Sequence, residues 1–215
     1  MAKAAVKKIE SKLPDLVVHD CEQNSPQWYE ARLGKVTASH FADIMAGGEG
    51  KVRTRYLRDL AGEIITGRPR ENYTNKSMDR GHEMENEARE QYARTNFAEI
   101  TRVGFIYNPE IDAGCSPDGL IGDDGMLEIK TMIPALLIGV LERGMMPPEH
   151  RAQCHGAMWV LRRKRCALRI FYPGMPTYTA EIERDPIYEK EISDAVEIFQ
   201  YDLKKLVQKI RAMQR

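Results

Sequence analysis

The feature of this sequence that most limits its fold is a hairpin signal at residues 115–132, which read CSPDGLIGDDGMLEIKTM. Two apolar runs flank the turn-forming segment Gly-Asp-Asp-Gly, and this arrangement predicts two antiparallel strands joined by a tight turn. Acidic residues are uncommon in strands, yet Asp118 stands at the start of the first strand and Glu128 lies inside the second, followed by Lys130. Side chains alternate between the faces of a strand, so Glu128 and Lys130 share one face. The hairpin should bring Asp118 back alongside Glu128.

Two carboxylates that converge beside a lysine repel each other unless a cation lies between them. Hard oxygen ligands of this kind suit Mg²⁺, which Mn²⁺ can replace. Lys130 would then orient an attacking water or neutralise charge that develops on a phosphate. The alternative is that Asp118 is a turn residue and the Glu-x-Lys pair a solvated strand face, with Leu127 and Ile129 on the buried face. A lone Glu-x-Lys usually is that, but the complete string favours a site.

The rest of the chain reads as one domain of helices around a small mixed sheet, an α/β (or α+β) fold. Residues 1–20 look like a polar lead-in and residues 21–215 like a single domain, since no repeat or linker divides them. The basic, glycine-rich segment 47–55 predicts a mobile loop. Caps and apolar spacing predict helices at 25–34, 37–45, 56–66, 77–95, 148–161 and 186–213, and further strands at 100–107, 166–172 and 177–183.

Composition excludes several classes of protein. Basic and acidic residues number 32 each among the 215 residues, which argues against a protein that coats nucleic acid by net charge but leaves room for a local basic groove. No apolar stretch resembles a membrane span or a signal peptide, so we expect a cytoplasmic protein without a membrane partner. The four cysteines are scattered and predict free thiols rather than an iron–sulfur cluster. No G-x-x-x-x-G-K-[ST] motif for ATP is present.

Four motifs in order give the chain a specific resemblance. Ser116-Pro-Asp and Glu128-Ile-Lys resemble the two signature elements of the PD-(D/E)xK nuclease superfamily. More narrowly, the chain is similar to the lambda exonuclease, or YqaJ viral recombinase, family. The supporting stretches are W-x3-R-L-G-x2-T-A-S from Trp28, G-x3-E-N-x-A-R from Gly81 and Q-x4-M-W from Gln153.

This resemblance implies a restriction-endonuclease-like core with a catalytic centre on the hairpin. It implies that Asp118, Glu128 and the backbone carbonyl of Ile129 bind the metal, and that Lys130 positions the attacking water. Glu85 would be a third, metal-associated catalytic carboxylate. Glu85 lies closer to the apolar stripe of its predicted helix than the other acids there. The alternative is an ordinary surface acid.

The other two motifs imply a contact to the reacting phosphate and a pocket for a terminal phosphate. Gln153 would reach a phosphate or a water as a catalytic residue, or else is an ordinary polar helix residue. An aromatic residue often follows this glutamine by three in the wider superfamily, and here that position is Gly156. Arg32 lies one turn after Trp28, and Ser39 lies at a predicted helix start that favours an anion. The resemblance implies that Arg32 and Ser39 bind the 5′-phosphate of the digested strand; taken singly they are a surface arginine and a capping serine.

Further basic residues are candidate DNA contacts or simply solvated charges. Lys76 and Arg80 precede Glu85 on the same predicted helix, and Lys51 and Arg53 belong to the predicted loop. The densest basic run is 162–165, for which DNA contact and a basic turn are equally good interpretations.

Together these features favour a Mg²⁺-dependent 5′→3′ exonuclease that digests linear double-stranded DNA and leaves 3′ single-stranded tails. By resemblance we expect a homotrimeric ring, a single-strand annealing protein as partner, and a phage or prophage origin with activity in the cytoplasm of a bacterial host. The alternatives are a PD-(D/E)xK endonuclease, a Cas4-like iron–sulfur nuclease, a DNA-binding module without catalysis, and an interaction domain with a fortuitous hairpin.

Overall fold

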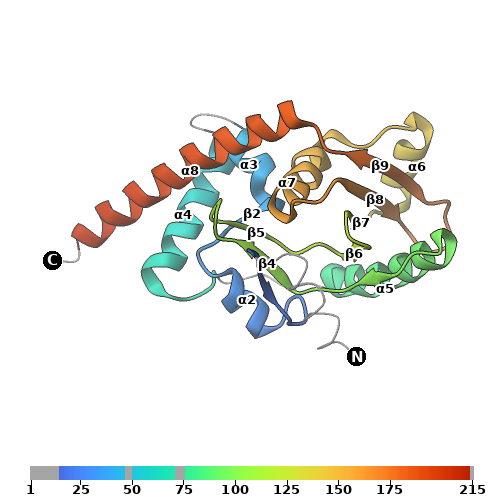
Figure 1. Ribbon diagram of the computed structural model, residues 1–215, viewed down its shortest axis with the longest axis horizontal. Coiled ribbons are helices and arrows are strands. Elements are labelled where there is room, and N and C mark those ends of the chain that lie inside the picture. The colour runs from blue at the N-terminus through green and yellow to red at the C-terminus, as the bar shows by residue number, and fades with distance from the viewer. Residues whose placement is uncertain (1–14, 47–49, 71–75, 214–215) are drawn as a thin grey trace.

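Two mixed β-sheets with helices packed around them form the described part of this computed structural model, residues 15–46, 50–70 and 76–213 (Figure 1). The smaller sheet has the order β1-β4-β5-β2 and the larger the order β3-β6-β7-β8-β9. In each sheet one pair is parallel, β2 with β5 and β7 with β8. The expected mixed α/β class is confirmed, with two sheets in place of one. The strands are β1 (Val17–His19), β2 (Val36–Thr37), β3 (Ile100–Thr101), β4 (Phe105–Asn108), β5 (Ala113–Cys115), β6 (Gly119–Ile121), β7 (Gly125–Thr131), β8 (Arg165–Phe171) and β9 (Tyr178–Glu183).

The strand predicted at 100–107 is two strands that belong to different sheets. β3 pairs with β6 in the larger sheet, whereas β4 pairs with β1 and β5 in the smaller one. The chain changes sheets at Gly104, where a Cβ atom would lie 2.3 Å from the carbonyl oxygen of Cys21. Only glycine allows such a close backbone approach, and this explains why the run divides there.

Residues just before the predicted boundary at residue 21 contribute to the smaller sheet. Val17–His19 form β1, which pairs with β4 through Val18 and Ile106, and Leu16 is part of the buried core. Three residues with mixed burial carry no strand periodicity, so the pairing could not be read from this segment. Residues 1–14 of the expected lead-in lie outside the described residues.

The N-terminal helices agree with the sequence in part. α2 (Pro26–Arg32) begins as predicted, with the Ser25 side chain accepting a hydrogen bond from the Trp28 amide. The single helix predicted at 37–45 is instead β2, a 3₁₀ turn η1 (Ala38–His40) and α3 (Phe41–Met45). Thr37 is extended and stands at the N-cap position of η1, as one of the predicted cap positions; its side chain makes no capping hydrogen bond, and its amide donates to the Tyr56 hydroxyl at 3.1 Å.

The described part of the expected loop at 47–55 is helical from Lys51 onward. α4 (Lys51–Thr66) starts at Lys51, and the Thr54 amide donates to the Gly50 carbonyl in its first turn. Residues 47–49 lie outside the described residues. The other helices are α5 (Lys76–Asn96), α6 (Pro134–Arg143), η2 (Pro148–His150), α7 (Arg151–Leu161) and α8 (Pro186–Ala212). Within the described residues, none of the helices has the length and apolar character to cross a membrane.

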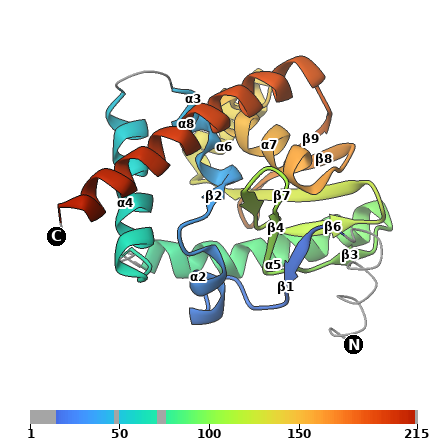
Figure 2. The same ribbon diagram turned by 60° about the vertical axis from the view of Figure 1, so that its left-hand side comes forward.

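The hairpin is confirmed, and its second strand β7 is the middle strand of the larger sheet. β6 and β7 pair antiparallel, with Gly119 opposite Leu127. β7 is buried on both faces rather than on one. Met126 belongs to the main core, while Leu127 and Ile129 pack in a smaller cluster with residues of α5, which runs along the larger sheet (Figure 2). Glu128 is therefore only 3% exposed and Lys130 is half-buried, so the face of β7 that they share is not a solvated one.

Candidate active site

Asp118 is fixed by the turn that leads into β6. Its amide donates to the Leu127 carbonyl at 3.1 Å, and its Oδ2 accepts the Ile129 amide at 2.6 Å. The backbone pairing of β6 with β7 ends at Gly119 and Leu127. Beyond this point the Asp118 carboxylate, rather than a backbone carbonyl, accepts the Ile129 amide. The N–H and C=O of one strand residue point to the same edge. The Ile129 carbonyl therefore points toward the side on which Asp118 lies.

Glu128 receives two donors from different elements. Its Oε1 accepts from Lys130 Nζ at 2.8 Å and from the side-chain amide of Gln153 on α7. Glu128 and Lys130 share a face of β7, as alternation predicts, and α7 covers that face. The structure thus brings the hairpin and the glutamine helix together, although 25 residues separate Glu128 from Gln153.

The electrostatics of this group favour a bound cation. Burial raises the pKa of Asp118, and the carboxylates of Glu128 and Glu85 raise it further. Burial lowers the pKa of Lys130, but the Glu128 carboxylate outweighs it, so the net shift is upward and Lys130 stays protonated. A cation between the carboxylates would remove the repulsion that raises the pKa of Asp118.

The donor set suits a hard divalent cation. Asp118, Glu128 and the Ile129 carbonyl supply oxygen atoms on one side of the hairpin. Glu85 lines the same cavity. Among the residues described, however, no three His, Cys, Asp or Glu side chains are close enough to form a ready-made metal site. The fit therefore rests on two carboxylates and a carbonyl, with Glu85 as a neighbour.

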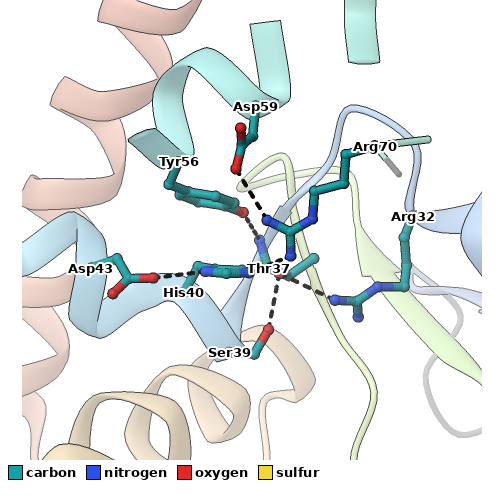
Figure 3. Close-up of polar contacts among 8 residues, drawn as sticks. All are labelled: Arg32, Thr37, Ser39, His40, Asp43, Tyr56, Asp59 and Arg70. Carbon is teal, nitrogen blue, oxygen red and sulfur yellow. Dashed lines mark hydrogen bonds and ion pairs between the residues drawn. The ribbon is translucent and has the colours of Figure 1, made fainter. Parts of the chain in front are cut away.

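One cavity of about 220 Å³ joins this group to a second one. The second group is built around Ser116, whose Oγ accepts from Trp28 Nε1 at 2.9 Å and from the Arg32 guanidinium at 3.2 Å. Arg32 also stacks on the Trp28 ring, 4.1 Å from its centroid, and donates to Thr37 Oγ1 at 3.5 Å. Thr37 Oγ1 in turn lies 3.2 Å from Ser39 Oγ (Figure 3). Burial lowers the pKa of Arg32, yet an arginine keeps its charge in proteins. Arg32, Ser39 and Ser116 thus offer a cation and two hydroxyls to an anion.

Comparison with known proteins decides the family. The model of the YqaJ-like viral recombinase domain matches residues 27–164, which include every residue of both groups. The chain belongs to this family. No curated protein sequence matches it.

Solved structures agree with this family assignment. The alkaline exonuclease LHK-Exo from Laribacter hongkongensis is 32% identical, with a TM-score of 0.81 over 88% of this chain and 98% of that one. The structure of LHK-Exo in complex with dAMP gives a TM-score of 0.82 with the same identity and coverage. A phage related exonuclease from Haemophilus somnus 129PT is 14% identical and has a TM-score of 0.63 over 82% of this chain and 96% of that one, which shows a shared fold alone.

The sequence did not predict a structural role at the Ser116-Pro-Asp turn for three residues. The first is Ser116, whose place two positions before Asp118 in the signature was the available signal. Gln23 Nε2 donates to the carbonyls of Pro117 at 3.1 Å and Val103 at 3.2 Å. Arg89 Nε donates to the Asp118 carbonyl at 2.7 Å. Arg89 closes the motif that contains Glu85, so its place there was a signal, whereas nothing marked Gln23.

The candidate DNA contacts are less well placed. Lys51 is exposed at the start of α4, and Arg53 Nη2 pairs with Asp202 of α8 at 2.8 Å with only 12% of its side chain exposed. Neither is among the described residues that line the cavity. Lys76 and Arg80 are in the first part of α5, where the side chains lie outside the described residues.

The basic run 162–165 is mostly engaged within the protein. Arg162 pairs with Asp15 and Glu110, and Arg163 is buried and donates to carbonyls of the β6–β7 turn. Arg165 pairs with Asp124 at 3.2 Å. These contacts favour a structural role for the run.

Proposed function

We propose that this protein is a metal-dependent 5′→3′ exonuclease that digests linear double-stranded DNA and leaves 3′ single-stranded tails. One observation carries the proposal. A single cavity is lined both by the Asp118, Glu128 and Lys130 group and by the Arg32, Ser39 and Ser116 group. Membership in the YqaJ-like viral recombinase family and the likeness to an alkaline exonuclease support nuclease activity.

The hairpin residues would hold the metal and prepare the reaction. Asp118, Glu128 and the Ile129 carbonyl would bind Mg²⁺, for which Mn²⁺ can substitute, with Glu85 assisting. A divalent cation bound there supplies acidified water and charge neutralisation at the phosphate. Lys130 carries a proton and would orient the attacking water or bond to the phosphate oxygens. Gln153 would hold Glu128 in place and contact the phosphate from α7.

The second group would give the reaction its direction. A terminal 5′-phosphate bound by Arg32, Ser39 and Ser116 would fix the adjoining phosphodiester beside the carboxylates. Only the bond nearest the 5′ end can then reach the hairpin, so cleavage would release nucleotides from that end. An internal phosphodiester has no terminal dianion to fill the pocket, and this disfavours the endonuclease alternative.

The wider setting is proposed on the same basis. The sequence has no ATP-binding motif of the P-loop kind, so processive digestion would come from a homotrimeric ring around the duplex. The product tail would be taken up by a single-strand annealing protein in the cytoplasm of a bacterial host, in phage-type recombination. The four cysteines are widely scattered in the sequence, and this spacing favours a nuclease without an iron–sulfur cluster over the Cas4-like alternative.

End-labelled duplexes test the proposal. Linear DNA carrying either a 5′-phosphate or a 5′-hydroxyl would be digested in Mg²⁺ and in EDTA, beside Lys130→Ala. We expect metal-dependent loss of the 5′-ended strand alone, faster from the phosphate, and no digestion by the variant. Internal cuts would instead favour an endonuclease, and intact DNA in every reaction would favour a DNA-binding module.

A further inference from the structure

A second cavity lies on the far side of Arg32. It has a volume of about 80 Å³ and is lined by Trp28, Tyr29, Arg32, Lys35, Thr37, His40, Tyr56, Asp59, Leu60, Glu63, Pro69 and Arg70. Arg32 lines both this cavity and the larger one. The two are therefore neighbours that share one guanidinium, and the smaller is the more distant from the carboxylates of the hairpin.

Arg70 is held in position toward this second cavity. Its Nη1 pairs with Asp59 at 3.3 Å, and its Nη2 lies 3.4 Å from Nε2 of His40 (Figure 3). His40 Nδ1 lies 2.7 Å from an Asp43 oxygen, and the ring stacks on Tyr56 with 4.1 Å between centroids. Because a carboxylate only accepts, Nδ1 carries the proton and Nε2 accepts from Arg70. Burial lowers the pKa of His40, consistent with this neutral form.

The charges of the cavity suit an anion. Its lining has three cations, Arg32, Lys35 and Arg70, against two carboxylates. Asp59 pairs with Arg70, and the two oxygens of Glu63 accept the amides of Gly34 at 2.9 Å and Arg70 at 3.1 Å. Arg70 and Arg32 are also close enough that each charge disfavours the other. Arg32 donates to the Thr37 hydroxyl, and Arg70 lines the same cavity. A guanidinium presents a fork of N–H donors that fits phosphate oxygens.

We propose that this cavity is a second phosphate subsite, in which Arg70 and Arg32 bind a phosphoryl group attached on the 5′ side of the terminal phosphate. The proposal rests on the proposed function, because the first phosphate is the one placed by Arg32, Ser39 and Ser116. One kind of DNA end carries this chemistry, a 5′-polyphosphate, in which a second phosphoryl group is bonded directly to the first.

Anion binding tests the subsite without catalysis. Titration calorimetry in EDTA would compare inorganic phosphate with pyrophosphate for wild type, Arg70→Gln, Arg70→Lys and the control Arg94→Gln, which changes a 70% exposed arginine on α5. We expect pyrophosphate to bind wild type and the control about tenfold tighter than phosphate, the effect of one charge-assisted contact. Arg70→Gln should lose this difference while phosphate affinity is kept, and Arg70→Lys should keep part of it.

Three results would overturn the subsite: equal affinity of wild type for both anions, no effect of Arg70→Gln, or equal loss of both anions in that variant. Digestion then tests the subsite on DNA. Duplexes with a 5′-monophosphate or a 5′-triphosphate would be compared, and Arg70→Gln should slow only digestion from the triphosphate end. Normal digestion of the monophosphate end by wild type, with no effect of Arg70→Gln on the triphosphate end, would also overturn the subsite and would leave the proposed function standing.

Discussion

At the residue scale, Ser116 joins the two groups of the cavity. Its hydroxyl accepts from Trp28 and Arg32, while the next-but-one residue is Asp118. One short segment therefore contributes to both the phosphate pocket and the metal ligands. A change at Ser116 should disturb the pocket without moving the carboxylates.

Ser116→Ala should weaken the preference for a 5′-phosphate. The substitution removes the acceptor that orients Arg32, so the rate on 5′-phosphate ends should fall about tenfold, the effect of one charged hydrogen bond. The rate on 5′-hydroxyl ends should stay near that of wild type. Initial rates on the two ends measure this, with Ser193→Ala on α8 as the control. An equal loss on both ends would show that Ser116 supports the hairpin rather than the pocket.

His155 on α7 should give the stability a defined pH dependence. Burial lowers the pKa of His155 and Arg151 lowers it further, against the opposing charges of Asp185 and Glu189. Below about pH 6.5 the unfolded chain binds a proton that the folded chain resists, so the free energy of unfolding falls as the pH drops.

His155→Asn removes this titration. At pH 7.5 the variant should be about 1–2 kcal/mol less stable than wild type because a smaller side chain replaces a buried imidazole ring. The deficit should shrink at pH 5.5, where wild type alone loses stability at this position. Urea unfolding at both pH values measures the difference, and the other histidines cancel in the comparison. A deficit that stays constant with pH would contradict the expectation.

The residues brought together here were partly predictable. Asp118, Glu128 and Lys130 stand out because charge is unusual inside a strand, and Arg32 and Ser39 because a motif groups them. Gln23 and Arg89 were not identified as supports of the Asp118 turn, since they hold backbone carbonyls 94 and 29 residues away. Contacts of that kind follow from tertiary packing, so even for Arg89, which closes the motif around Glu85, the sequence does not show which group the side chain holds.

At the element scale, α7 shows why this chain lacks an aromatic residue three positions after Gln153. A Cβ atom at Gly156 would lie 2.1 Å from Cδ2 of Phe41, whose ring occupies the space beside the helix. Glycine at this point lets α7 pack closely on α3 and keeps Gln153 within reach of Glu128. The ring of Phe41 fills the volume that a side chain at 156 would need.

Gly156→Ala should therefore be destabilising although alanine favours helices. The added methyl overpacks the core, at a cost of about 1–3 kcal/mol. The matched control is Gly62→Ala on α4, where nothing lies within 4 Å of an added Cβ; there we expect a gain of about 0.5–1 kcal/mol. Chemical denaturation of both variants measures the contrast. Equal effects of the two substitutions would mean that Phe41 moves aside without cost.

Element prediction succeeded where local signals are strong. The helices α2, α5, α7 and α8 have caps or long apolar spacing, and the hairpin has its turn residues. The strands β1, β2 and β5 have only two or three residues each, too few for any periodicity, and they exist because distant partners pair with them. Thr37 illustrates this, since Tyr56 fixes its extended backbone from α4.

At the scale of the whole molecule, the candidate site lies where the chain passes from one sheet to the other. β5 ends at Cys115 in the smaller sheet, the Ser116-Pro-Asp turn follows, and β6 begins at Gly119 in the larger one. The prediction of a single sheet missed this junction because pairing between distant strands is not encoded locally. A cation bound by Asp118 and Glu128 would link the turn between the two sheets to β7. Its binding should therefore raise the free energy of unfolding of the whole domain.

Mg²⁺ should accordingly raise the melting temperature of wild type. A ligand that binds only the folded state at 100 times its Kd adds about 2.7 kcal/mol to the free energy of unfolding. In EDTA this gain should vanish, and Asp118→Asn, which loses a charged ligand but keeps an acceptor for the Ile129 amide, should show little gain at the same Mg²⁺ concentration. Thermal unfolding with and without Mg²⁺ measures both proteins. An equal rise in the variant would place the stabilising cation elsewhere on the molecule and would remove the link between the hairpin carboxylates and the metal.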